Sequence, residues 1–237
     1  MRLFAIADPH LSSVHPKPMS IFGGNWSGHP NIFFERWREI VQADDVVIVA
    51  GDISWALKLS DAMPDLEMIG ALPGRKIILR GNHDYWWPSI SKLRAALPPS
   101  IQALQNDSLV IADTAICGTR GWTCPGNDDF TNEDEKIYAR ELERFKLALQ
   151  SLKDKTYKKL VIALHYPPTN GAFAPSGFTD LIEQAKPDAV VYGHLHGVHP
   201  TRALSNWQGI KLQFVACDAV EFRPQLLFEI QPLSLEP

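Results

Sequence analysis

Five apolar stretches of this sequence each end in residues that can bind a metal ion or move a proton. The clearest example is Gly-Asn-His-Asp at 81–84, directly after the apolar run at 76–80. A buried strand does not need three polar side chains at its end, so these residue types indicate chemistry rather than packing. The residues after the other four runs are Asp8-Pro9-His10, Gly51-Asp52, His165 and Gly193-His194-Leu195-His196.

The five runs lie at 3–7, 45–50, 76–80, 159–164 and 188–193. Each is almost continuously apolar and rich in Val, Ile, Leu and Ala, which is typical of strands covered on both faces. Ligands in α/β proteins bind beyond the carboxyl ends of such strands. We therefore expect these polar residues to converge on one site, although they are far apart in the sequence.

The donor atoms of this set are nitrogen and oxygen without sulfur, which suits Mn, Fe or Zn rather than an iron–sulfur cluster. A lone histidine near an apolar run is usually structural, but 5 of the 8 histidines fall in these motifs. The candidate ligands are too many for one ion and about right for two ions that share a carboxylate. They are Asp8, His10, Asp52, Asn82, His165, His194 and His196.

The elements between these motifs predict a layered α/β sandwich formed by a single domain over 1–237. The apolar periodicity predicts helices over 31–42, with Asn31 as a possible cap, and over 132–152. The apolar segments within 101–119 lie too close together for intervening helices and suggest hairpin-linked strands, as do 211–217 and 225–230. Residues 11–30 are rich in Pro, Gly, Ser and His and are expected to form a long surface loop.

Composition limits the class of protein. Hydrophobic residues make up 45% of the 237 residues, which is enough for a full core. A net charge of −4 argues against general affinity for nucleic acid. The sequence shows no signal peptide and no membrane-length apolar run, so we expect a cytoplasmic protein without a membrane partner. The 3 cysteines form no disulfide framework, and Cys117 and Cys217 are interpreted as small buried residues.

The motif order D-x-H, G-D, G-N-H-D, H and G-H-x-H resembles that of the calcineurin-like metallophosphoesterases. The motifs extend from Asp8 to His196, and the segment VACDAVEFRPQLLFEI at 215–230 looks like the closing strands of bacterial members. The resemblance implies a four-layer αββα sandwich of two mixed sheets flanked by helices. It also implies a dinuclear metal site at the carboxyl ends of the strands.

The resemblance assigns a role to each candidate ligand. Asp8, His10 and His196 would bind the first metal, Asn82, His165 and His194 the second, and Asp52 would bridge the two. A bridging ligand must offer two oxygens at short reach, which a carboxylate does, and Gly51 lets the backbone crowd close beside it. The implied cofactors are two divalent ions (Mn, Fe or Zn, with Mn favoured), which together can activate a water and clamp an in-line displacement.

The same resemblance implies that His83 is the general acid that protonates the leaving alkoxide. Asp84, its neighbour, would brace the loop or cap the next helix. Many relatives read G-D-x-x-D, and that second carboxylate holds the catalytic histidine. Here the stretch is GDISW, and Trp55 occupies the place. The carboxylate support of His83 is therefore missing or supplied from elsewhere.

The favoured substrate is a small phosphodiester or nucleotide, and Arg80 and Arg120 are candidates to grip its phosphate. The enzymatic alternative is a phosphomonoesterase, including a protein phosphatase. The other alternative is a non-catalytic, metal-holding interaction scaffold on the same fold. The sequence leaves the natural substrate and the oligomeric state open.

Overall fold

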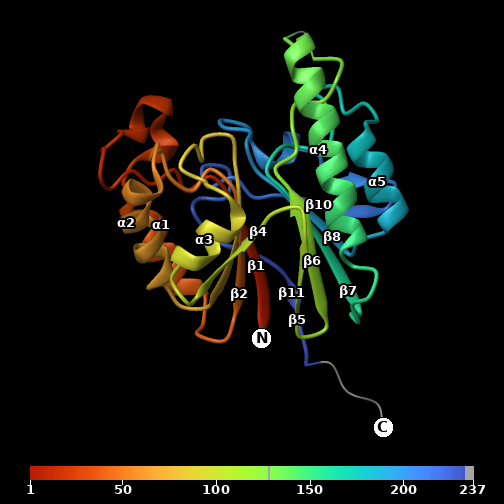
Figure 1. Ribbon diagram of the computed structural model, residues 1–237. Coiled ribbons are helices and arrows are strands. Elements are labelled where there is room, and N and C mark those ends of the chain that lie inside the picture. The colour runs from red at the N-terminus through yellow and green to blue at the C-terminus, as the bar shows by residue number, and fades with distance from the viewer. Residues whose placement is uncertain (128, 233–237) are drawn as a thin grey trace.

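The computed structural model describes residues 1–127 and 129–232 and contains two β-sheets that face each other between layers of helices (Figure 1). The first sheet has the strand order β11-β1-β2-β3-β4. Strands β1 to β4 are parallel, and β11 pairs with β1 in the antiparallel sense. The strands are β1 (Arg2–Ile6), β2 (Val46–Ala50), β3 (Arg75–Leu79), β4 (Ile101–Leu104) and β11 (Gln225–Glu229).

The second sheet has the order β5-β6-β7-β8-β10-β9. Its four inner strands are parallel, and the edge strands β5 and β9 are antiparallel to their neighbours. The strands are β5 (Ser108–Ile111), β6 (Thr114–Thr119), β7 (Lys159–Leu164), β8 (Ala189–Tyr192), β9 (Asn206–Trp207) and β10 (Ile210–Phe214). Both sheets are mixed, as the resemblance implied.

Helices cover the outer face of each sheet, so the architecture is the expected four-layer αββα sandwich (Figure 1). Helices α1 (Asn31–Ile40), α2 (Leu59–Gly70) and α3 (Ile90–Ala96) lie on the first sheet. Helices α4 (Asn132–Gln150) and α5 (Gly177–Ala185) lie on the second. Three short 3-10 turns span Met19–Phe22, Gly24–Trp26 and Pro200–Arg202.

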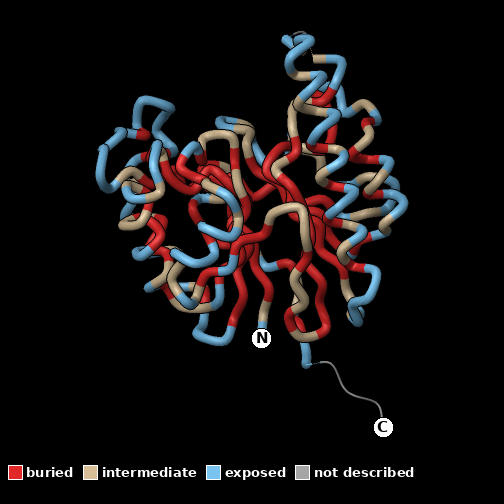
Figure 2. Tube along the Cα trace, viewed as in Figure 1, coloured by how far each residue is buried: buried red, intermediate tan, exposed pale blue. Residues whose placement is uncertain are grey.

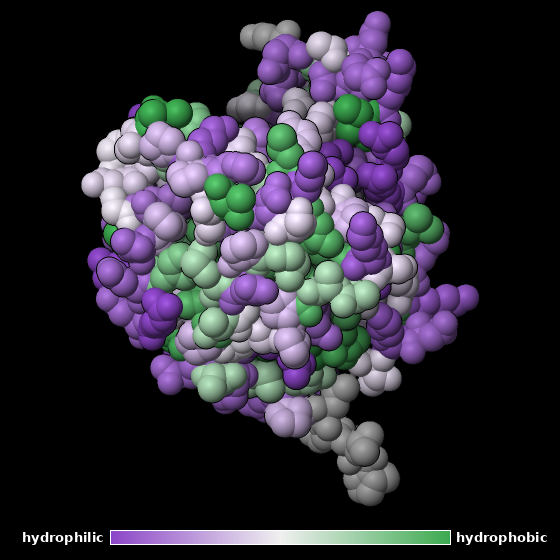
Figure 3. Space-filling view, turned by 60° about the vertical axis from the view of Figure 1, so that its left-hand side comes forward, coloured by the Kyte–Doolittle hydropathy of each residue, from purple (hydrophilic) through white to green (hydrophobic). Residues whose placement is uncertain are grey.

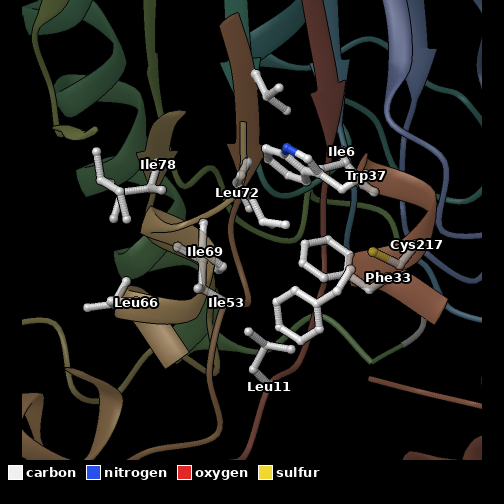
Figure 4. Packing of buried hydrophobic residues seen from close by; sticks show 14 of the residues in the cluster. Ile6, Leu11, Phe33, Trp37, Ile53, Leu66, Ile69, Leu72, Ile78 and Cys217 are labelled. Carbon is white, nitrogen blue, oxygen red and sulfur yellow. The ribbon is translucent and has the colours of Figure 1, made fainter. Parts of the chain in front are cut away.

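The continuous apolar runs are explained by the burial of both strand faces. In β2, Ile48 packs between the two sheets, whereas Val47 and Val49 pack under the helices of the first sheet. Successive side chains of a strand point to opposite faces, so a strand in an inner layer needs apolar residues at every position. Figure 2 shows the buried chain concentrated in the two central layers. Figure 4 shows Phe33 and Trp37 of α1 in the outer part of this core.

The two sheets meet at one edge, directly beyond the ends of β1 and β10. Ala7 and Ala216 form a parallel bridge there, with the Ala7 N–H donating to Val215 and the Cys217 N–H donating to Ala7. The carboxyl ends of the parallel strands point to this edge, which is uppermost in Figure 1. Residues that follow β1 are therefore brought beside residues that follow β10.

Two predicted strand connections are wrong. β4 and β5 are not a hairpin, because β4 pairs with β3 in the first sheet and β5 pairs with β6 in the second. β10 and β11 likewise belong to different sheets. The connection from β4 to β5 is short and crosses from one sheet to the other, which sequence spacing alone cannot distinguish from a hairpin turn. The β5–β6 pair is a hairpin as expected.

The helix predictions at 31–42 and 132–152 are confirmed, but the expected cap of the first is not. Asn31 is the first residue of α1, and the preceding Pro30 makes no side-chain cap bond. Helix α4 begins with a capping box between Thr131 and Asp134, which satisfies two backbone N–H groups.

The segment 11–30 is more than a surface loop. Met19 and Trp26 are buried within it, at 3% and 2% exposure.

All three cysteines are buried and free, as expected for Cys117 and Cys217. Figure 3 shows hydrophobic side chains scattered in small groups over the face in view. Among the described residues, no helix is both long enough and apolar enough to span a membrane.

Candidate metal centre

The polar residues at the strand ends come together in two adjacent groups. Asp8 and His10 follow β1 and His196 follows β8, and their ligand atoms all lie within 4.8 Å of one another. The Nε2 atoms of His10 and His196 are 3.0 Å apart. The nitrogens of two separate elements thus converge on one point.

A second group contains Asp52, His165 and His194, whose ligand atoms also lie within 4.8 Å of one another. Asn82 joins this group, because its Oδ1 atom is 2.7 Å from Nε2 of His165. The fold therefore brings together all seven residues that the sequence singled out, in the two sets that the resemblance assigned.

Asp52 lies between the two groups. Its Oδ2 atom is 3.7 Å from Nε2 of His10 and 3.5 Å from Nε2 of His165. Its other oxygen, Oδ1, accepts the backbone N–H of His83 at 2.8 Å. The hydrogen bond fixes the carboxylate so that the remaining oxygen faces both sets of imidazoles.

Four of the seven residues have a left-handed backbone. The φ angles are 60° for Asp8, 46° for His10, 52° for Asp52 and 71° for His194. Such conformations cost non-glycine residues of order 1–3 kcal/mol each and cluster at functional sites. The strain turns successive polar side chains toward the same edge of the sheets.

Two glycines allow the strand ends to approach closely. Gly51 has a φ of 92°, and a Cβ atom there would lie 2.6 Å from Nδ1 of His165. A Cβ atom on Gly81 would lie 2.1 Å from Oδ1 of Asp52. Any side chain at either position would displace Asp52 or His165, so the expected role of Gly51 is supported.

The electrostatics of the two groups favour a bound cation. Asp8 and Asp52 are 0% and 1% exposed, and burial raises the pKa of both carboxyl groups, with the Asp52 charge adding to the effect on Asp8. The buried Oδ1 of Asp8 and Oδ2 of Asp52 have no hydrogen-bond partner among the described residues. Buried carboxylates of this kind require a compensating charge.

Burial disfavours the charged form of His10, His165 and His194. Burial lowers the pKa of His165 to about 3 and that of His194 to about 2, and it lowers the pKa of His10 well below its usual value. Neutral imidazoles beside buried carboxylates are the donor set that divalent transition metals prefer. The residues present therefore fit two divalent ions.

Hydrogen bonds behind the histidines set their orientation. His165 donates its Nδ1–H to the carbonyl of Ala50 at 3.0 Å, which leaves Nε2 directed at Asn82 and Asp52. Nδ1 of His196 lies 3.1 Å from Oδ1 of Asp218, and Oδ2 of Asp218 accepts the N–H of Gly197. A carboxylate behind a histidine ligand fixes the ring and raises its basicity.

Asp218 is a functional residue that the sequence reasoning missed. It follows the apolar segment 211–217, so the rule that identified the other five motifs applies to it as well. Its buried side chain is placed by the Ala7–Ala216 bridge, which brings the end of β10 to the end of β1.

Two aromatic residues, Trp26 and Tyr166, pack on the histidines of the two groups. The Trp26 ring lies edge-on to His10 and His196, with centroid distances of 5.9 and 5.5 Å. The Tyr166 ring is 3.9 Å from that of His194. Their positions depend on tertiary contacts between distant segments, and no local sequence signal distinguishes them from ordinary core aromatics.

His83 lies beside both groups and is half-buried. Its ring centroid is 4.3 Å from that of Trp55 and 5.7 Å from that of His10. Burial lowers its pKa, while the Asp52 charge acts in the opposite direction. Trp55 therefore supports His83 by packing, and within the described residues we find no carboxylate hydrogen-bonded to the His83 ring. Lys17 covers Trp55, with Nζ 3.3 Å from the ring centroid.

Asp84 braces the loops that carry Asp52 and Asn82. Its Oδ1 accepts N–H groups of Ile53, Ser54 and the Trp86 indole, and its Oδ2 accepts the N–H of Gly81. The carboxylate thus joins the loop after β2 to the loop after β3. Of the two roles expected for Asp84, the structure supports bracing.

Arg80 and Arg120 lie beside the second group, and each guanidinium has one protein partner, while Nε of Arg120 has none among the described residues. Arg120 forms an ion pair with the buried Glu141 at 3.1 Å, and Nε of Arg80 donates to the Asp84 carbonyl at 3.2 Å. Arg144 also pairs with Glu141, at 2.6 Å. The Arg120 carbonyl accepts the N–H groups of His165 and Tyr166, which ties this segment to the site.

Comparison with known proteins decides the family. Residues 1–198 match the family described as calcineurin-like phosphoesterase. The chain belongs to that family. Calcineurin-like phosphoesterases are phosphoric ester hydrolases that typically bind two divalent metal ions, in agreement with the two groups described above. The search of curated proteins finds no match.

Solved structures share the fold at low sequence identity. A phosphopantetheinyl hydrolase from Mycobacterium tuberculosis is 16% identical with a TM-score of 0.58, covering 100% of this chain and 96% of that one. TT1561 of Thermus thermophilus is 13% identical with a TM-score of 0.56, covering 92% and 90%. AQ665 from Aquifex aeolicus, a protein of unknown function, is 15% identical with a TM-score of 0.50 and 95% coverage of both chains. These likenesses support the fold alone.

We expect Asp84→Ala to loosen the two loops that carry Asp52 and Asn82, because it removes the carboxylate that joins them. The change leaves four buried N–H donors without their acceptor, at a cost of roughly 1–3 kcal/mol for each unsatisfied group. Denaturant unfolding should show a loss of several kcal/mol, and elemental analysis should show reduced metal content. Asp154→Ala, an exposed aspartate in a turn, is the matched control and should behave as wild type. Wild-type stability and metal content in Asp84→Ala would contradict the bracing role.

Proposed function

We propose that the protein hydrolyses a small phosphodiester or nucleotide at a dinuclear metal centre. The observation that carries the proposal is that six nitrogen and oxygen donors lie in two groups with the Asp52 carboxylate between them. Asp8, His10 and His196 would hold one ion and Asn82, His165 and His194 the other. Manganese is the favoured metal, with iron and zinc as alternatives.

Two bound divalent ions would neutralise phosphoryl charge and lower the pKa of an attacking water. The protein contributes orientation. The imidazoles of His165 and His196, held from behind by Ala50 and Asp218, keep their other nitrogens directed inward. The left-handed backbones at Asp8 and Asp52 are maintained by the surrounding sheets, so no reorganisation is required when substrate binds.

His83 is proposed as the general acid. As water adds to phosphorus and the ester P–O bond breaks, the leaving oxygen takes a proton from the His83 ring. The Trp55 ring restricts the orientation of His83, and the hydrogen bond from the His83 N–H to Asp52 ties its backbone to the shared carboxylate. Packing thus replaces the carboxylate support that many relatives use.

The alternatives are a phosphomonoesterase, including a protein phosphatase, and a non-catalytic scaffold. A scaffold needs neither His83 beside Asn82 nor four strained residues at one point, so we favour an enzyme. Nucleic acid is a less favoured substrate because the net charge is −4.

The proposed function is tested by assaying metal-stripped protein with diester and monoester substrates after separate addition of Mn, Fe, Zn, Ni and Mg. We expect diester hydrolysis that requires added metal and is highest with Mn. Elemental analysis of the reconstituted protein should show about two metals per chain. A protein that holds no metal after anaerobic reconstitution with Mn or Fe would exclude the dinuclear centre.

Asp52→Asn should weaken both metal groups together. The amide keeps one oxygen for the His83 N–H but loses the charge and the second good donor oxygen. Metal content should fall clearly below that of wild type, and activity should fall with it. The exposed Asp154→Asn is the control. Unchanged metal content in Asp52→Asn would rule out a bridging role.

His83→Ala should retain its metals and bind substrate, while turnover falls by ~10²–10⁴-fold on esters with a poor leaving group. An alkoxide needs the proton, whereas a nitrophenolate leaves without it, so nitrophenyl esters should be affected much less. Because the ring is held by packing rather than by a carboxylate, we expect the low end of this range. Steady-state kinetics with alkyl esters and with nitrophenyl esters test this prediction. Equal losses of turnover on the two kinds of ester would leave His83 as a positioning residue only.

Arg80 and Arg120 are proposed to bind the substrate phosphate. A two-pronged guanidinium contact cannot be replaced by one ammonium, so Arg80→Lys and Arg120→Lys should each raise KM without changing metal content. Arg144→Lys, which shares the Glu141 partner, is the matched control for loss of the ion pair. Kinetics indistinguishable from wild type for both variants would assign these arginines to structure.

A further inference from the structure

A cavity of about 250 Å³ adjoins the second group of candidate ligands, the one that contains His165 and His194. His194 lies in its wall, together with Tyr166, whose ring stacks on that of His194 at 3.9 Å. Small-molecule sites usually measure ~300–1,000 Å³, so this volume suits one substituent of a small substrate rather than a polymer. His83 is not in the wall, because its ring packs on His10 and Trp55 instead.

Phe173 stands at this cavity in a conformation that the fold alone does not favour. Its side chain is 45% exposed although it is large and apolar, and its φ is 57°. A bulky residue rarely adopts a left-handed backbone, and exposing an aromatic ring to water is unfavourable. Both features are explained if the ring is placed in advance for contact with a bound group.

The turn that carries Phe173 is held by Asn170. The Asn170 Oδ1 accepts the N–H groups of Ala172 and Ala174, its Nδ2 donates to the Pro125 carbonyl, and its own carbonyl accepts the Phe173 N–H. Asn170 itself is buried. The backbone that carries the exposed ring is therefore held on both sides of Phe173 by hydrogen bonds.

The other walls indicate the chemistry of the occupant. Leu195 and Leu204 supply apolar surface, and Thr169 and Asn127 supply neutral polar groups. Arg202 and Asp129, the charged side chains among the described lining residues, are of opposite sign. Aromatic and aliphatic walls with neutral polar groups fit a planar heterocyclic moiety better than a second phosphate.

We infer that this cavity binds the retained organic group of a phosphodiester, a planar ring system of about nucleoside size. The inference rests on the proposed function. In an in-line displacement the attacking and leaving oxygens lie on opposite sides of phosphorus, and the retained ester oxygen is equatorial. With the leaving oxygen at His83, the equatorial retained group projects to the side of the attack axis, and we place it in the cavity that His194 lines.

In the reaction, water adds to phosphorus and releases one proton to solvent, the bond to the leaving oxygen breaks, and that oxygen takes a proton from protonated His83, which solvent then reprotonates. The retained ester bond stays intact, and the product is the monoester of the group in the cavity. A monoester substrate has no retained group, so the cavity contributes nothing to its binding. The inference therefore selects the diester among the substrate classes considered.

Two diesters with one leaving group test the inference: thymidine 5′-(p-nitrophenyl phosphate) and methyl p-nitrophenyl phosphate. Metal-reconstituted wild type should prefer the thymidine ester. Phe173→Ala should lower kcat/KM roughly 5- to 100-fold for the thymidine ester, as expected for loss of a stacking contact, and leave the methyl ester within about twofold. Because the leaving group is shared, the comparison does not depend on His83.

Phe173→Gly removes the same ring but relieves the left-handed backbone, so it should show the same selectivity even if its stability differs. Leu147→Ala on α4, which is 54% exposed and does not line the cavity, should match wild type on both esters. Equal losses on the two esters, or no loss on either, would overturn the inference.

A binding measurement separates this inference from the proposed function. Thymidine, which has no phosphate, should bind metal-free wild type, observed as saturation transfer to its ring protons, and Phe173→Ala should abolish the signal. Absence of the signal in wild type would contradict the cavity assignment. A protein that binds thymidine but hydrolyses neither diester with metal restored would refute the proposed function and leave only the binding site.

Discussion

Asp8 and Asp52 are carboxylates that lie almost entirely out of water, and within the described residues neither is paired with a lysine or arginine. The imidazoles of His10 and His165 lie near these carboxylates, but burial lowers their pKa values, so they do not supply the missing positive charge. Such an arrangement is costly unless a cation enters it. The remaining features of the site are explained by the need to hold these two carboxylates together.

The two carboxylates are held in place mainly by the backbone around them. Strained φ angles turn Asp8 and Asp52 toward each other, and the Asp84 carboxylate joins the loops after β2 and β3. The Ala7–Ala216 bridge brings the second sheet to the end of the first, so that Asp218 can orient His196. Each of these contacts crosses between elements, and the site therefore depends on the packing of both sheets.

Different aromatic residues pack on the histidines at the two ends of the site. Trp55 packs on His83, whereas Tyr166 packs on His194 beside the cavity that contains Phe173. In the proposed function these sides serve the leaving group and the retained group of a diester. The two ends of the substrate would then be recognised by different chemistry, proton donation at one and stacking at the other.

The sequence by itself predicted strands covered on both faces and the seven candidate ligands, because strand burial and strand-end polarity are local properties. The order of its motifs resembled that of the calcineurin-like phosphoesterases, and the family match over residues 1–198 confirms this resemblance. It did not determine that β4 and β5 belong to different sheets, since a short crossing and a hairpin have similar lengths. Nor did it identify Tyr166, whose contact with His194 joins two segments that are separate in the chain. The support of His83 by Trp55, the orientation of His196 by Asp218 and the cavity at Phe173 were decided by tertiary structure alone. Each arises from side chains of separate elements, and their meeting depends on how the two sheets pack rather than on any local pattern.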